Sequence, residues 1–176
     1  MGSMGQSNLT VHDFKERLEF SEKASDEPFW DAIYKKAFPN IVNQMLASGN
    51  VKSQRMGIDR VVLLSSGKIL YIDEKKREID YQDILLEYVS VDKTGAPGWI
   101  EKDLLIDYLA YAFMPSKRVY LFPWDMLRRA WCHYKDNWLE IYARIEAQNQ
   151  GYKTISVAIP IQILQKAVQT AMVIQL

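Results

Sequence analysis

The stretch RMGIDRVVLLSSGKILYIDEKKR, residues 55–77, decides the fold expected for this chain. It holds two apolar runs rich in β-branched residues, 58–64 and 68–75, separated by the turn-forming residues Ser65-Ser66-Gly67. The pattern predicts two antiparallel strands joined by a tight hairpin. Because such strands fold back on each other, the start of the first meets the end of the second. We therefore expect Asp59 and Asp73 to lie close together.

The second run passes directly into Asp73-Glu74-Lys75-Lys76-Arg77, a group of opposite charges with no spacer before it. Side chains alternate along a strand, so Asp73 and Lys75 share one face and Glu74 points to the other. Two carboxylates held close together repel, which raises one pKa unless a cation lies between them. Oxygen ligands without cysteine or histidine nearby suit Mg²⁺ or Mn²⁺. A lysine beside them can contact a water or the charge that develops on a phosphate.

These residues resemble the motif of the PD-(D/E)xK nuclease superfamily, which has the restriction-endonuclease-like fold. The resemblance is carried by Gly57-Ile58-Asp59, the apolar strand after it and Ile72-Asp73-Glu74-Lys75, and it extends over roughly 29–122. It implies that Asp59 and Asp73 bind Mg²⁺ or Mn²⁺, with the carbonyl of Glu74 as a further ligand. It also implies that Lys75 is the catalytic lysine, positioning the water that cuts a phosphodiester.

The chain departs from the family pattern at two positions. Ile58 stands where many members have proline, and Glu74 stands where the middle residue is usually apolar. A second register therefore stays open, with Glu74 as the metal ligand and Lys76 as the lysine. We favour Asp73 and Lys75, because the alternation then places Tyr71 and Ile69 beneath the site. The alternative to any metal site is a solvated strand end in which Asp59 forms an ion pair with Arg60 or Arg77.

Further candidates surround this motif. Gln54 precedes it and can orient a metal-bound water, or it is an ordinary loop residue. Glu87 lies on a third predicted strand, 83–91, and joins the site if that strand neighbours the second; otherwise the strand is an edge with its polar face in water. Four arginines are candidate contacts to a nucleic acid, whose phosphates attract local positive charge: Arg60, Arg77, Arg128 and Arg129.

Outside the hairpin, the apolar spacing predicts an α/β domain with one mixed central sheet flanked by helices. Residues 1–9 read as a flexible start with a tag scar, and 10–176 as a single domain. Helices are expected near 10–18, from Pro28 onward with continuation through 41–46, over 124–145, and from Pro160 to Ala171. Strands are expected at 119–122 and 152–159, whereas 104–113 fits either a helix or a buried strand.

The charge balance limits the possible functions. The chain has 176 residues, with 22 Lys plus Arg, 22 Asp plus Glu and one cysteine. A net charge of zero argues against coating nucleic acid through bulk charge, although 52–77 has seven basic and three acidic residues. One cysteine and no apolar segment of membrane-spanning length suggest a cytoplasmic protein. We expect a nuclease acting on DNA, less readily on RNA, with a homodimer allowed. The alternative is a non-catalytic nucleic-acid-binding or assembly protein on the same fold with an inactive site.

Overall fold

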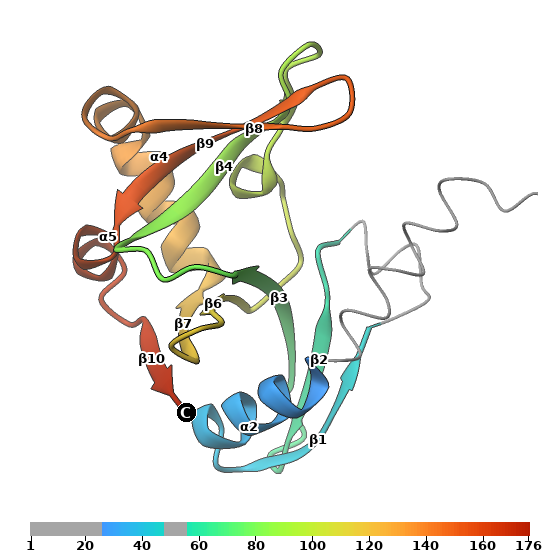
Figure 1. Cartoon of the computed structure of the whole chain (residues 1–176). Helices are drawn as coiled ribbons and strands as arrows, with labels where there is room; N and C mark the ends of the chain where they lie inside the picture. Colours follow the sequence, from blue (N-terminus) through green and yellow to red (C-terminus); the bar gives the residue numbers. More distant parts are fainter. Residues whose placement is uncertain (1–25, 48–55) are drawn as a thin grey trace, which may run out of the picture.

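Two β-sheets and three α-helices make up the part of the chain that the computed structural model describes, residues 26–47 and 56–176 (Figure 1). The helices are α2 (Glu27–Ala37), α4 (Trp124–Ile141) and α5 (Ile161–Ala167), with a 3-10 turn η1 (Trp99–Glu101). The six-stranded sheet contains β1 (Ile41–Leu46), β2 (Arg60–Leu64), β3 (Ile69–Arg77), β6 (Tyr108–Phe113), β7 (Arg118–Pro123) and β10 (Met172–Gln175), in that order. The four-stranded antiparallel sheet has the order β5 (Ala96–Pro97), β4 (Asp83–Val91), β9 (Lys153–Pro160) and β8 (Arg144–Gln148).

The predicted hairpin is present. β2 and β3 are antiparallel, with Arg60 opposite Ile72 and Leu63 opposite Ile69. Gly67 has φ +81° in the connecting turn, a left-handed conformation that glycine adopts without strain. On its other side β3 pairs with β6 in parallel, so β3 is an interior strand of the larger sheet. This position explains why the charged end of β3 is partly buried rather than solvated.

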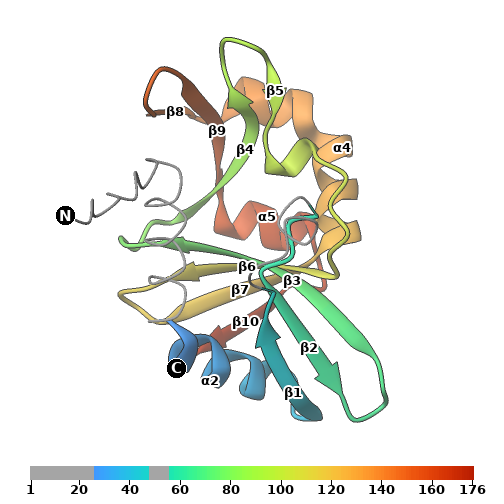
Figure 2. The same cartoon turned by 90° about the vertical axis from the view of Figure 1, so that its right-hand side faces the viewer.

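Each face of the six-stranded sheet has its own core. Helix α2 covers one face with Trp30, Ile33 and Tyr34, which pack on apolar side chains of β2, β3, β6 and β7. Helices α4 and α5 and the smaller sheet cover the other face (Figure 2). Along β3 the apolar Leu70 and Ile72 therefore face α2, and the alternate residues point to the opposite side of the sheet.

Several sequence predictions need correction. The segment 41–46 is strand β1 rather than a continuation of α2, because α2 ends before Phe38 and the segment pairs with β2 instead. Helix α4 stops at Ile141, and 144–148 forms β8. The last helix stops at Ala167, and 172–175 pairs with β7 as β10. The ambiguous 104–113 contains strand β6.

The predicted single sheet is in fact two sheets. β4 spans 83–91 as expected, but it pairs with β5 and β9 and not with β3. In the described part of the chain, no helix is both long and apolar enough to cross a membrane. The helix expected near 10–18 lies outside the described residues.

Candidate functional site

The site begins with two aspartates on neighbouring strands. Asp59 directly precedes β2, and its N–H donates to the carbonyl of Ile72 at 2.9 Å, which places it across from Asp73 on β3. The backbone N–H of Glu74 donates to Oδ2 of Asp59 at 2.9 Å. Asp73 is 1% exposed. The hairpin thus brings the two carboxyls together, as its geometry predicted.

Lys75 lies beside these carboxyls, on the same face of β3. Its Nζ is 2.5 Å from Oδ1 of Asp73 and 6.0 Å from the ring of Trp99. Burial lowers the pKa of the ammonium, but the charges of Asp73 and Asp59 raise it by more. The pKa of Lys75 therefore lies above its ordinary value. Lys75 is therefore held as a charged donor, with its side chain 32% exposed.

The Asp73 carboxyl has a raised pKa and is therefore harder to ionise than an ordinary aspartate. Burial raises its pKa to about 7 despite the nearby Lys75 charge, and a hydrogen bond to Asp59 together with the Asp59 charge raises it further. Its Oδ2 is buried and meets no hydrogen-bond donor among the described residues. Because two carboxylates cannot hydrogen-bond without a proton, this pair is completed either by a shared proton or by a cation.

The donor set fits a hard divalent cation. Two aspartate oxygens with a buried, donor-free Oδ2 match the one or two carboxylates through which proteins usually bind Mg²⁺, the rest of its shell being water and substrate phosphate. Within residues 26–47 and 56–176, no group of three or more acidic, cysteine or histidine side chains is arranged for a metal.

Glu74 belongs to the opposite face of the sheet. Its Oε1 accepts from Nε of Arg60 at 2.5 Å and from the hydroxyl of Tyr34 at 3.0 Å. Lys76 pairs with Asp26 at 3.0 Å and lies 3.8 Å from Glu78. The second register, Glu74 with Lys76, would thus use a carboxylate already bonded in the α2 core, which favours the register of Asp73 and Lys75.

Two of the four candidate nucleic-acid contacts are engaged inside the protein. Arg60 is 0% exposed, so the structure places it in the core and not at a nucleic-acid surface. Arg77 pairs with Asp83 at 2.9 Å and its guanidinium lies 3.8 Å from the ring centre of Tyr81, which leaves the side chain 18% exposed. Sequence alone could not show this, because arginines beside a charged strand end look solvated.

Glu87 approaches the site from the other sheet. β4 does not pair with β3, but the Lys75 charge still acts on the half-buried Glu87 carboxyl. Burial raises the pKa of Glu87, and the positive charges of Lys102 and Lys75 oppose this rise. The backbone N–H of Trp99 also bonds this carboxyl. Gly98 lets the turn before Trp99 lie against the backbone of β4, since a Cβ there would lie 2.2 Å from the backbone oxygen of Glu87. Gln54 lies outside the described residues.

Trp99 and Gly98 were not among the predicted site residues. The Pro-Gly-Trp sequence at the end of β5 signals a turn, but nothing local shows that the turn returns to Lys75. The tight contact at Gly98 is a tertiary feature, since it joins the turn to the backbone of β4.

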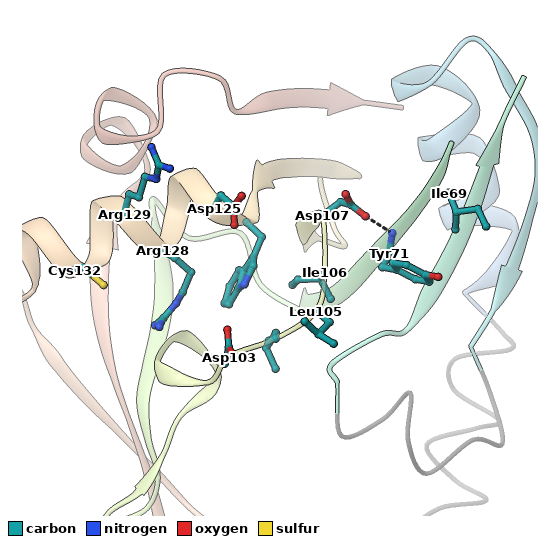
Figure 3. A pocket seen from close by; sticks show the side chains of 12 residues that line it. Ile69, Tyr71, Asp103, Leu105, Ile106, Asp107, Asp125, Arg128, Arg129 and Cys132 are labelled. Carbon is teal, nitrogen blue, oxygen red and sulfur yellow. Dashed lines mark hydrogen bonds between the residues drawn. The ribbon is translucent and has the colours of Figure 1, made fainter. Parts of the chain in front are cut away.

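An open pocket of about 750 Å³ lies beside β3 (Figure 3). The residues of β3 that line it alternate in step with Asp73 and Lys75, so they share the same face of the strand. Ile69 and Tyr71 of β3 line one side, and Arg128 and Arg129 of α4 line another. The Tyr71 N–H donates to Oδ2 of Asp107 at 2.8 Å, and Arg128 donates to the carbonyl of Ile100. Three aspartates also line the pocket: Asp103, Asp107 and Asp125.

No family model, curated protein or solved structure matches this chain. The site itself combines a buried pair of carboxyls, a lysine in contact with one of them, and a pocket along the same strand face.

Proposed function

We propose that this protein is a divalent-metal-dependent nuclease that hydrolyses phosphodiester bonds of DNA. The observation that carries the proposal is the buried, donor-free Oδ2 of Asp73 next to the Asp59 carboxyl, with Lys75 at 2.5 Å from the same carboxylate. Like charges buried together are costly, and a cation removes that cost. The order α2, β1, β2, β3 and the parallel β6 also supports a restriction-endonuclease-like core.

Asp59 and Asp73 would hold Mg²⁺ or Mn²⁺. When bound, the metal supplies a water of lowered pKa and neutralises charge on the phosphate. The carbonyl of Glu74 stays a proposed further ligand. Asp59 is oriented by the Glu74 N–H, and Asp73 is buried away from bulk water.

Lys75 would donate hydrogen bonds to a nonbridging phosphate oxygen or to the attacking water. The neighbouring carboxylates keep it charged, because they raise its pKa. The charges of Glu87 on β4 and of Lys75 interact, and Glu87 would help to orient the ammonium. Preorganised donors of this kind contribute most where charge develops in the transition state.

The substrate strand would leave the site along β3 toward the pocket. Arg128 and Arg129 on α4 would contact its phosphates there, and contacts of this kind position a nucleic acid without reading its sequence. The three aspartates give the lining one more negative than positive charge, so phosphate contacts are expected at the arginines and not across the whole pocket.

The test is a cleavage assay on labelled single-stranded DNA, duplex DNA and RNA with Mg²⁺, with Mn²⁺ and with EDTA. We expect metal-dependent cleavage by the wild type and a loss of at least about 100-fold in Asp73→Asn and Lys75→Met. The matched control Asp136→Asn changes an exposed aspartate of α4 and should cut normally. If folded wild type cuts none of these substrates with either metal, the non-catalytic binding or assembly role replaces the nuclease.

A further inference from the structure

The two proposed metal ligands are each followed by a residue that points to the opposite face of the hairpin. Asp59 is followed by Arg60 and Asp73 by Glu74, and these two side chains pair at 2.5 Å on the α2 side of the sheet. Thus one face holds two carboxyls that repel each other when ionised, and the other holds an attractive pair between the same two strands.

Backbone contacts connect the two faces. The Glu74 N–H donates to Oδ2 of Asp59, while the Glu74 carboxylate accepts from Arg60, the residue next to Asp59. A closed ring of one covalent link, one ion pair and one hydrogen bond therefore spans the hairpin. Moving Glu74 would displace its neighbours Asp73 and Lys75 along with the donor that orients Asp59.

We propose that Arg60 and Glu74 are positioning residues, an ion pair on the back of the hairpin that holds the Asp59 and Asp73 carboxyls at metal-binding separation. This inference rests on the proposed function, since it assigns a role in building that site. In this role neither side chain would contact the substrate. The Arg60–Glu74 pair acts through the backbone of β2 and β3.

Burial and further hydrogen bonds hold the Arg60–Glu74 ion pair in place. Arg60 is 0% exposed, and the Glu74 side chain is 7% exposed, so water does not screen their attraction. The guanidinium also bonds both carboxylate oxygens of Glu27 at 2.8 and 3.2 Å, and the Tyr34 hydroxyl bonds Glu74 at 3.0 Å. Helix α2 thereby fixes the pair from outside the hairpin. Groups that orient metal ligands in this way typically change metal affinity 10–100-fold when removed.

The test measures Mn²⁺ binding by isothermal titration calorimetry without nucleic acid, at a temperature where circular dichroism shows each variant folded. Arg60→Lys keeps the charge but loses the fork that reaches Glu74 and Glu27 together, and Glu74→Gln keeps the shape but loses the charge. We expect both to bind Mn²⁺ at least 10-fold more weakly than the wild type. Arg60→Met should lose more, and if it does not fold, the two milder variants decide.

Val62→Ala is the matched control, because Val62 is 0% exposed, lies on β2 and faces α2 as Arg60 does. It should lower the melting temperature through a cavity while leaving Mn²⁺ affinity within threefold of wild type. If Arg60→Lys and Glu74→Gln bind Mn²⁺ as tightly as the wild type, the positioning role is overturned and the nuclease proposal stands. The same holds if Val62→Ala loses as much Mn²⁺ affinity as these two variants. Absence of Mn²⁺ binding in the wild type would overturn both.

Discussion

Replacing Asp73 with asparagine removes a buried carboxyl whose ionisation opposes folding. The pKa of this carboxyl rises from 3.8 to about 7, chiefly through burial. Below about pH 3.8 the folded and unfolded chains both carry the proton. Between 3.8 and 7 the folded protein keeps it while the unfolded chain releases it, so wild-type stability falls as pH rises.

The size of this effect follows from the same pKa change. A rise from 3.8 to about 7, which already includes the opposing effect of the Lys75 charge, corresponds to about 4 kcal/mol lost between pH 4 and pH 8. Asparagine does not titrate, and its amide can donate to Asp59. We therefore compare the free energies of unfolding of Asp73→Asn and the wild type. The value for the variant minus that for the wild type should increase by up to about 4 kcal/mol from pH 4 to pH 8.

The assay is urea unfolding of both proteins at intervals from pH 4 to pH 8, with EDTA present so that no divalent ion compensates the charge. Titrating groups that do not interact with Asp73 cancel in the difference, and the exposed Asp136→Asn serves as the control with a flat difference. A difference for Asp73→Asn that is also flat, or that moves against the variant as pH rises, would refute the account of a buried carboxyl under strain.

Three further outcomes follow from the contacts. Mg²⁺ at a hundredfold excess over its Kd should stabilise the wild type by about 3 kcal/mol at pH 8, seen as a higher melting temperature, and should leave Asp73→Asn unchanged. Gly98→Ala should destabilise by about 1–3 kcal/mol in chemical unfolding, because its Cβ would lie 2.2 Å from the Glu87 carbonyl oxygen; an unchanged midpoint would contradict that contact. Tyr34→Phe should cost about 1.5–3 kcal/mol by losing its bond to the Glu74 carboxylate, and a smaller loss in an Arg60→Met background would show that the two contacts are coupled.

Local sequence was sufficient for the hairpin and for the meeting of its two aspartates. The alternation of apolar residues and the Ser-Ser-Gly turn determine an antiparallel pair, and antiparallel pairing alone brings position 59 opposite position 73. The same alternation separates Lys75 from Glu74. These inferences needed only period-two geometry, which depends on neighbours in the chain.

The tertiary structure decided the rest. Whether β3 is central depends on β6, more than 30 residues later, and only that pairing makes the charged strand end a buried site. From sequence Arg60 is a candidate contact to nucleic acid, but α2 covers its face of the sheet. The Lys75 charge acts on Glu87 although their two sheets do not pair. The segment 41–46 forms a strand because its backbone pairs with β2. Burial and charge pairing depend on which distant segments pack together, and a local residue pattern does not show those contacts.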